Sequence, residues 1–512
     1  MKTPILGSTY VARSVNAADA RMVNLFPEIV PEAGKEPAFL NRAPGLKLLN
    51  SIGTGPIRGL WAFSPQDGTG FVVSGTQLYK INNSYAPTLI GAVAGTGPVS
   101  LADNGTQLFI AANGPSYIYN NTTNAFGQIT DPDFPGAVTV AYLDGYFVFN
   151  QPNSQKMWIT ALLDGTSIDP LEFASTEGSP DGLVAVASNF REIWAFGTNS
   201  IEVWYDSGAT DFPLQRIQGA FNELGCAAPF SVAKMDNALF WLGRDRRGQG
   251  MVYRANGYAG QRISTHAVEW QIQQYSDLSD AIAYTYQQDG HSFYVLIFPS
   301  ANTTWVYDAA TQAWHERAGW SNGEFTRHRS NCQMAFNNKV VVGDYENGNI
   351  YAFDLDDYSD NGQIQKWLRS WRALPTGQNN LKRTAQHSLQ LDIEAGTGLN
   401  GSMIAETIYL QTEDGDYLVT ESGDRLIAEQ QTVVTQGSNP EVMLRWSDDG
   451  GHTWGNEHWA QIGKIGEYYR RVFWRRMGMT LKLRDRVYEL SGTDPVKISI
   501  MGAELILSPT NA

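Results

Sequence analysis

A degenerate repeat between about residues 56 and 353 constrains this chain more than any other feature of its sequence. Each unit has a strand, a hairpin turn of Asp, Asn or Gly, an apolar strand and then an aromatic-rich strand. The units start every roughly 40–50 residues, which is the period of a β-propeller blade. We count seven units, and in one of them the four parts are residues 99–102, 103–105, 108–111 and 116–119.

The repeat is compatible with two architectures. A pair of stacked β-sandwiches would also need many short strands, but the regular period and the recurring aromatic strand favour a propeller. Because no WD or kelch signature marks the units, we expect six to eight blades, with seven favoured. The 50 glycines, 23 tyrosines and 15 tryptophans suit short strands joined by tight turns. The expected fold class is all-β, with a β-propeller and a C-terminal β-sandwich-like domain.

The pattern also predicts how the chain is divided. Residues 1–50 contain five prolines and no sustained periodicity, which predicts an extended N-terminal arm. An acidic, turn-forming stretch at 354–362 ends the repeat, so we expect the propeller over 51–358 and the β-sandwich-like domain over 359–512. Residues 399–437 look inserted, because they contain two successive copies of Thr-Glu-x-Gly-Asp-x-Leu-Val/Ile. We expect that insertion to form a protruding acidic hairpin.

Charge, cysteine content and hydropathy limit the classes of partner. The net charge of −15 argues against attraction of the whole protein to nucleic acid. Cys226 and Cys332 are the only cysteines and lack CxxC spacing, which predicts no disulfide framework, no zinc knuckle and a reducing compartment. Residues 1–30 lack the apolar core of a signal peptide, and no apolar run approaches the roughly 18 residues of a membrane span. We therefore expect a soluble protein without a membrane partner.

The stretch from Arg445 to Trp454 fits Ser-x-Asp-x-Gly-x-Thr-Trp, the Asp-box pattern of sialidases and other β-rich proteins. Its glycines supply positive-φ positions, its side-chain oxygens can bind turn backbone, and its tryptophan can fold back over the turn. Sialidases commonly repeat the pattern in several blades, whereas here it occurs once and outside the repeat. We therefore interpret it as a structural turn made by Ser447, Asp449, Gly451, Thr453 and Trp454.

The sequence offers no assembled constellation for catalysis, a cofactor or a metal. It has no HExxH, Walker loop, GxSxG or dinucleotide fingerprint, and Asp414-Gly415-Asp416 lacks the rest of an EF-hand. His452 and His458 lie on the predicted C-terminal hairpin without a third ligand. The paired carboxylates of a glycosidase cannot be singled out among 52 acidic residues. We expect a protein that is not an enzyme and that binds no cofactor and no metal.

A local basic patch stands out in this acidic chain. Between Lys464 and Arg486, eight basic residues are opposed only by Glu467 and Asp485. The patch could contact nucleic-acid phosphates, pair with an acidic surface of a neighbouring subunit, or be a solvated strand face, and the residues leave these three readings open. The candidate residues are Arg470, Arg471, Arg475, Arg476, Lys482, Arg484 and Arg486.

Motifs at both ends of the chain resemble one family of viral proteins. Arg13-Ser14, the block Arg-Met-Val-Asn-Leu-Phe-Pro-Glu at 21–28 and Ala-Pro-Gly-Leu at 43–46 resemble the opening of the packaged-DNA stabilisation proteins of short-tailed bacteriophages. Residues 445–454 and the block Tyr-Arg-Arg-Val-Phe-Trp-Arg-Arg-Met-Gly at 469–478 resemble the C-terminal signature of that family. The motifs bracket nearly the whole chain, while the insertion has no match among them.

The resemblance implies a structural virion protein, the tail hub or nozzle. Such a protein would form a ring, expected as a homohexamer, below the portal and the head-to-tail adaptor. It would help to retain packaged DNA, form the DNA exit channel, and contact tail fibre, tailspike or needle proteins. The expected location is the virion tail, after synthesis in the cytoplasm of the bacterial host. The alternative function is a host-surface propeller that binds or cleaves glycans, as sialidases do.

Overall fold

A computed structural model divides the chain into two compact units. The propeller unit consists of residues 8–26 and 43–363, and the sandwich unit of residues 1–7, 27–42 and 364–512. The described residues are 1–14, 18–31, 34–64, 68–176, 178–209, 212–244, 247–372, 382–400, 403–410, 418–420, 426–434, 436–481 and 486–510.

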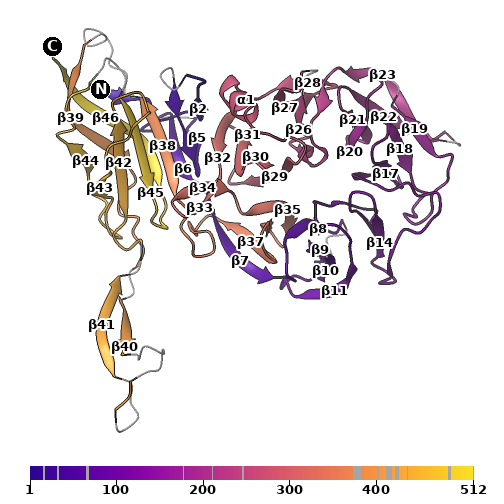
Figure 1. The fold of residues 1–512 in the computed structure, drawn as a ribbon, viewed down its shortest axis with the longest axis horizontal. Coiled ribbons are helices and arrows are strands. Elements are labelled where there is room, and N and C mark those ends of the chain that lie inside the picture. The colour runs from indigo at the N-terminus through magenta and orange to yellow at the C-terminus, as the bar shows by residue number, and fades with distance from the viewer. Residues whose placement is uncertain are drawn as a thin grey trace. The chain divides into compact units, whose positions relative to one another are not determined.

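In the described part of the propeller unit, seven antiparallel sheets surround a common centre (Figure 1). The first three blades are β8 (Ile57–Ala62), β9 (Gly70–Ser74), β10 (Gln77–Ile81) and β11 (Pro87–Ala92); β12 (Ser100–Asp103), β13 (Gln107–Ala111), β14 (Ser116–Asn120) and β15 (Phe126–Gln128); and β16 (Val140–Leu143), β17 (Tyr146–Asn150), β18 (Lys156–Ile159) and β19 (Phe173–Ser175). The predicted β-propeller is confirmed, with the favoured number of blades in the described residues.

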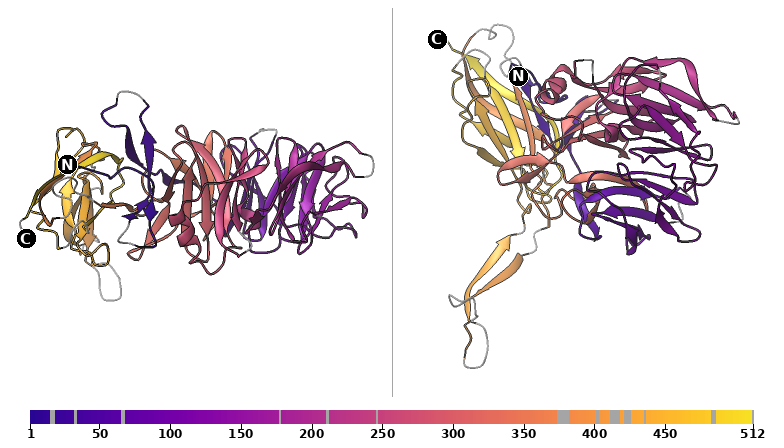
Figure 2. Two further views of the ribbon diagram at one scale, coloured as in Figure 1. Left: turned by 90° about the horizontal axis from the view of Figure 1, so that it is seen from above. Right: turned by 45° about the vertical axis from the view of Figure 1, so that its right-hand side comes forward.

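The remaining four blades continue the same antiparallel order. They are β20 (Leu183–Asn189), β21 (Glu192–Gly197), β22 (Ile201–Asp206) and β23 (Leu214–Asn222); β24 (Gly225–Cys226), β25 (Ala233–Met235), β26 (Ala238–Arg244), β27 (Gly250–Asn256) and β28 (Ala259–Arg262); β29 (Ile282–Gln288), β30 (His291–Phe298), β31 (Thr303–Asp308) and β32 (Ala313–Glu316); and β35 (Ser330–Phe336), β36 (Lys339–Asp344), β37 (Asn349–Asp354) and β7 (Gly45–Ser51). Figure 2 shows these strands running side by side across the thickness of the propeller unit.

Turn residues explain why each blade folds locally. The turns Asp144-Gly145, Asp236-Asn237 and Asn337-Asn338 connect β16 to β17, β25 to β26 and β35 to β36. All six residues have positive φ, between 45° and 102°. Asn, Asp and Gly tolerate this backbone, and two successive positive-φ residues give a turn whose twist matches the paired strands.

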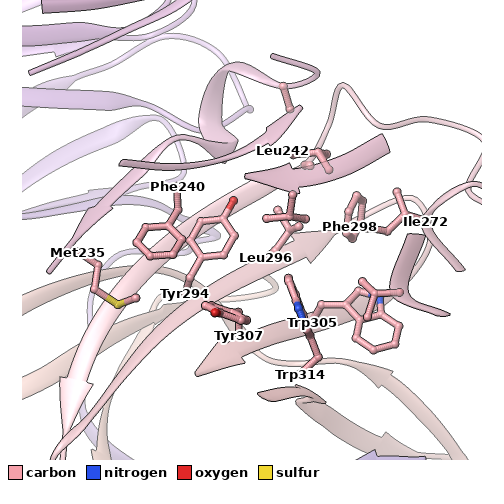
Figure 3. Close-up of a cluster of buried hydrophobic side chains, with 14 of the residues drawn as sticks. Met235, Phe240, Leu242, Ile272, Tyr294, Leu296, Phe298, Trp305, Tyr307 and Trp314 are labelled. Carbon is pink, nitrogen blue, oxygen red and sulfur yellow. The ribbon is translucent and has the colours of Figure 1, made fainter. Parts of the chain in front are cut away.

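The hydrophobic core of the propeller unit lies between neighbouring blades. Figure 3 shows the cluster between blades 5 and 6, where Phe240 and Leu242 of β26 face Tyr294 and Leu296 of β30. The Phe240 and Tyr294 rings stack with centroids 5.4 Å apart. Each neighbouring pair of blades shares such a cluster, including blades 7 and 1. The circle of blades is therefore held by side-chain packing, to which hydrogen bonds between blades such as that from Val186 N–H to the Thr139 hydroxyl are added.

The last blade is completed by a strand from the beginning of the chain. β7 pairs antiparallel with β37, with Leu46 opposite Phe353 and Leu48 opposite Tyr351. Residues 1–50, expected as an extended arm, thus contribute the outermost strand of blade 7. This strand links the two ends of the propeller sequence.

Smaller elements decorate the propeller unit. The helix α1 (His266–Ile272) follows blade 5 and is capped at its N-terminus by Thr265, whose side chain accepts from the Val268 N–H. A parallel bridge joins β4 (Met22–Val23) to β32. The other elements are the 3-10 turn η1 (Pro229–Ser231) and the paired strands β2 (Tyr10–Val11) with β3 (Asp19–Ala20) and β33 (Ala318–Ser321) with β34 (Glu324–Arg327).

The sandwich unit contains two groups of paired strands. One has the order β44-β39-β46-β6-β5 with β1 beside β46, and the other has the order β38-β45-β42-β43. Their bounds are β1 (Lys2–Thr3), β5 (Leu25–Ile29, of which 27–29 belong to this unit), β6 (Ala38–Arg42), β38 (Trp367–Arg372), β39 (Thr384–Ile393), β42 (Glu441–Ser447), β43 (His458–Gln461), β44 (Val472–Arg475), β45 (Val487–Gly492) and β46 (Ser499–Pro509).

N-terminal residues are built into the sandwich unit. Thr3 pairs with Ala503 across β1 and β46, and its hydroxyl accepts from the Trp371 indole N–H at 3.1 Å. Arg369 is 1% exposed and donates from Nε to the Ile5 carbonyl at 2.6 Å. Residues 1–7 are therefore an integral part of this unit.

The inserted region contains β40 (Met403–Tyr409) and β41 (Ile427–Val434), which pair antiparallel with each other. Most of the duplicated motif lies outside the described residues. Three leucines at eight-residue spacing form a closed cycle of backbone hydrogen bonds, from Leu410 to Leu426, Leu418 to Leu410 and Leu426 to Leu418, at 2.8–2.9 Å. The eight-residue spacing of the duplicated motif thus coincides with backbone hydrogen bonds among three equally spaced leucines.

Candidate functional site

The Asp-box residues form a tight turn after β42. The Asp449 carboxylate accepts from the Ser447 hydroxyl at 2.6 Å, the Thr453 hydroxyl at 2.7 Å and the backbone N–H groups of His452 and Thr453 at 3.0 and 2.9 Å. Gly451 has a φ of 100°, and its N–H donates to the Ser447 hydroxyl at 2.9 Å. The carboxylate therefore serves the backbone of its own turn.

Side chains next to the turn attach it to the sandwich unit. The Arg445 guanidinium lies over the Trp454 ring at 5.0 Å and pairs with Glu489 on β45. Arg486, which is 2% exposed, holds the Asp448 carboxylate with two contacts of 2.6 and 2.8 Å. These contacts give the turn an architectural role.

We expect Asp449→Ala to lower the melting temperature of the sandwich unit at pH 7. Hydrogen bonds from Ser447 and Thr453 hold the pKa of the Asp449 carboxyl well below its usual range. A depressed folded-state pKa gives stability that is present above the unfolded pKa of about 3.9 and is lost as pH falls towards the folded pKa. The difference in melting temperature between wild type and variant should therefore be constant from pH 7 to about 5 and become smaller below about pH 4.

Calorimetry over that pH range measures this difference. His452→Ala is the matched control, because this exposed neighbour contributes only its backbone N–H to the turn. If the two melting temperatures were equal at pH 7, or if their difference did not change with pH, the assigned role of the carboxylate would be contradicted.

The structure separates the members of the predicted basic patch. Arg470, Arg471, Arg475 and Arg476 are exposed on and beside β44. Arg486 is buried, donates to the Met477 carbonyl at 2.7 Å and is neutralised by Asp448. Lys482 and Arg484 lie outside the described residues.

A cavity of about 530 Å³ lies at the centre of the propeller unit, lined by the innermost strands of the blades. The Arg58 guanidinium in its wall donates to four backbone carbonyls. The Asp103 carboxylate accepts from the Trp61 indole at 2.7 Å and the Ser64 hydroxyl at 2.8 Å. Desolvation raises the pKa of the Cys332 thiol to about 12. The side chains of Arg58 and Asp103 in this wall are thus engaged in structure, and the Cys332 thiol stays protonated at neutral pH.

The histidines that sequence analysis considered are placed on the surface or in packed layers. The His458 ring stacks on Trp446 with centroids 4.6 Å apart, and His452 is exposed. In the propeller unit, burial and, to a smaller extent, the charge of Arg317 together lower the pKa of His328 to about 3. Within the described ranges, no three His, Cys, Asp or Glu residues are grouped so that they could hold a metal ion.

Two turns of blades 3 and 4 display bulky side chains that sequence analysis missed. Leu162, Leu163 and Phe190 are 60%, 59% and 63% exposed. Leu163 and Phe190 have φ of 60° and 50°, a backbone region that costs large side chains about 1–3 kcal/mol. A signal existed in the sequence, because Phe190-Arg191 stands between two strands where other blades have Asp, Asn or Gly.

Acidic residues surround these turns. The Leu163 N–H donates to the Gly145 carbonyl at 2.8 Å, and Arg191 pairs with Asp144 at 2.9 Å. Burial raises the pKa of Tyr146 in the same hairpin, and two nearby carboxylates raise it further. We name the resulting surface the propeller-rim patch; it comprises Leu162, Leu163, Phe190, Asp144, Glu172 and Asp206.

In the part of the chain that the structure describes, no helix is both long enough and apolar enough to cross a membrane. Two solved structures share a general likeness to the chain. The computationally designed Ika8 protein is 12% identical and covers 61% of this chain and 100% of its own, with a TM-score of 0.37. The Neurospora crassa Pan2 WD40 domain is 9% identical and covers 58% of this chain and 89% of its own, with a TM-score of 0.39.

Comparison with protein families is more informative. Residues 1–358 match the family described as Bacteriophage P22 Gp10, beta-propeller, and residues 416–507 match Bacteriophage P22 Gp10, beta-sandwich. The tail hub protein gp10 of Salmonella phage P22 is 21% identical over 448 residues, which is 83% of each protein. The predicted fold class, a β-propeller with a C-terminal β-sandwich, is confirmed. The chain therefore belongs to the P22 Gp10 family of phage tail hub proteins, which are structural components of the virion.

Proposed function

We propose that this protein forms a homohexameric ring in the tail, below the portal and the head-to-tail adaptor, where it helps to retain packaged DNA and forms the DNA exit channel. Membership of the tail hub family over both units carries the proposal. Tail fibre, tailspike or needle proteins are the proposed partners on the side of the ring that faces away from the adaptor.

The charge of the chain supports a channel role. A net charge of −15 repels DNA phosphates on average, so DNA can pass without being held. Blades packed on both sides by neighbouring blades, as in the propeller unit, suit a rigid ring component. Because the protein repels DNA on average, the proposed function does not include recognition of a DNA sequence.

The function we propose does not include catalysis. The Asp-box carboxylate is engaged by its own turn, and the carboxylate in the wall of the propeller cavity is held by Trp61 and Ser64. Incubation of the purified protein with sialyl substrates should give no turnover above background. Turnover that disappears in Asp449→Ala or Asp103→Asn would favour the glycan-cleaving alternative.

Electron microscopy and light scattering of the purified full-length protein test the ring. The expected result is a sixfold ring with a mass six times 56.5 kDa. A protein that remains monomeric at micromolar concentration and is missing from purified virions would contradict the proposal. In a phage that lacks the protein, filled heads should lose their DNA, which quantitative PCR after nuclease treatment would detect.

A further inference from the structure

Two edge strands of the sandwich unit leave an unusual surface open. Among the described strands, β43 ends one strand order and β44 ends the other. The Trp474 indole on β44 donates to the His458 carbonyl on β43 at 2.8 Å, so the two edges lie together. Edge strands carry unpaired backbone groups that proteins normally cover. We name the exposed side chains here the sandwich-edge patch; they are Trp459, Tyr468, Tyr469, Arg470, Arg471, Phe473, Arg475 and Arg476.

The aromatic side chains of this patch are exposed to solvent. Trp459, Tyr468 and Tyr469 are 58%, 76% and 84% exposed. An open groove of about 630 Å³ runs between Trp459, Tyr469 and Phe473. Contiguous exposed apolar surface marks interaction sites, and Trp, Tyr and Arg dominate the energetic centres of protein interfaces. The composition of the patch is therefore that of a docking surface.

The positive charges of the patch arginines are not neutralised by carboxylates of the described residues. Arg470 donates to the Gln461 amide oxygen at 2.7 Å, and Arg475 lies over the Phe473 ring at 4.4 Å. Among the described residues, none of the four arginines forms an ion pair with a carboxylate. Guanidinium groups lose less on desolvation than ammonium groups, and they bind carboxylates through two nitrogens. An acidic surface is the natural partner, and this chain carries 52 acidic against 37 basic residues.

The propeller-rim patch has the complementary properties. It presents exposed leucine and phenylalanine side chains beside three carboxylates, of which Asp144 is already paired with Arg191. Its apolar residues Leu163 and Phe190 sit on strained backbone, where Asn or Gly would be more stable. Strain that brings no gain to the isolated fold indicates a use for the displayed side chain.

We propose that the sandwich-edge patch of one copy docks on the propeller-rim patch of a second copy of this chain. Arg470, Arg471 and Arg475 pair with carboxylates of the rim, and the exposed aromatic rings pack against Leu162, Leu163 and Phe190. The contact joins two different surfaces, so it is heterologous, and heterologous contacts close into rings when the rotation between copies allows. The inference rests on the proposed ring and assigns the contact that builds it.

Charge reversal tests the docking. The triple variant Arg470→Glu, Arg471→Glu, Arg475→Glu should weaken self-association about a hundredfold or more, because like charges would meet across the interface. Sedimentation velocity over a concentration series measures this. The matched control reverses three exposed lysines outside both patches, Lys234, Lys339 and Lys382, and should associate as wild type does.

A second set of changes should restore assembly. Asp144→Lys, Glu172→Lys and Asp206→Lys, added to the triple arginine variant on the same chain, re-create opposite charges across the contact. Association should return to within about tenfold of wild type. Absence of any recovery would overturn the assignment of the rim as the partner surface.

Phe190→Asn separates docking from a purely structural role. Asparagine adopts a φ of 50° readily, so the unfolding midpoint of this variant should rise, while its self-association should weaken about tenfold. A variant that is stabilised and associates normally would overturn the role of this residue in the contact.

The nature of the partner is tested in parallel. If the triple arginine variant forms normal rings but loses binding to a duplex DNA probe, the patch contacts DNA and the docking proposal is wrong. A wild-type protein that never self-associates contradicts the ring itself. If the triple arginine variant forms normal rings and binds DNA as wild type does, the docking proposal is wrong but the proposed ring still stands.

Discussion

Arg42→Met is expected to destabilise the sandwich unit by about 3–5 kcal/mol. Arg42 is 3% exposed and donates to the Gln365 carbonyl at 2.6 Å, the Val496 carbonyl at 3.0 Å and the Asp494 carbonyl. Methionine retains the apolar stem but leaves these buried acceptors without their donor. A buried acceptor that loses its donor costs about 1–3 kcal/mol, so several together approach the stability of a domain.

Hydrogen exchange localises this effect to one unit. Because a chain of two units need not unfold in one step, exchange of β45 amides should accelerate strongly while exchange of β21 amides stays unchanged. Lys35→Met is the control, since its exposed ion pair with Asp392 contributes about 1 kcal/mol or less. Equal acceleration in both units, or none in β45, would show that Arg42 does not anchor residues 27–42 to the sandwich unit.

The blades could be predicted from sequence because the signals for them are local. Each hairpin depends on two adjacent residues such as Asp236-Asn237, whose φ of 48° and 56° suits their side chains. Alternation along a strand is equally local: in β44, Val472 and Trp474 are buried while Phe473 and Arg475 are exposed. Patterns that repeat every two residues or every blade therefore carry over directly into structure.

Pairings between distant residues could not be predicted in the same way. The partner of β7 is β37, about 300 positions later in the chain, and nothing in the proline-rich sequence around Pro44 announces that strand. Arg486 is close in sequence to the other basic residues of the patch, yet its side chain is buried against Asp448. Which face a charged side chain occupies is decided by contacts that a single sequence does not display.

Leu46→Ala, the second change with a large expected effect, should cost about 2–5 kcal/mol in the propeller unit. Leu46 on β7 is fully buried and packs in the cluster between blades 6 and 7, with Phe26, Tyr351 and Phe353. The alanine leaves a cavity at the strand that completes blade 7. Because Leu46 packs in the cluster that joins blades 6 and 7, its loss weakens the contact between these two blades.

Leu48→Ala tests whether burial, and not merely a shorter side chain on β7, is the cause. Leu48 lies two residues along the same strand but is 45% exposed, so its replacement should change stability by less than about 0.5 kcal/mol. Urea unfolding followed by tryptophan fluorescence compares the two, with hydrogen exchange of β37 as the local readout. Equal effects of the two substitutions would mean that β7 does not close the propeller. A large loss for Leu46→Ala alone, with β37 exchanging first, would establish the N-terminal strand as its closure.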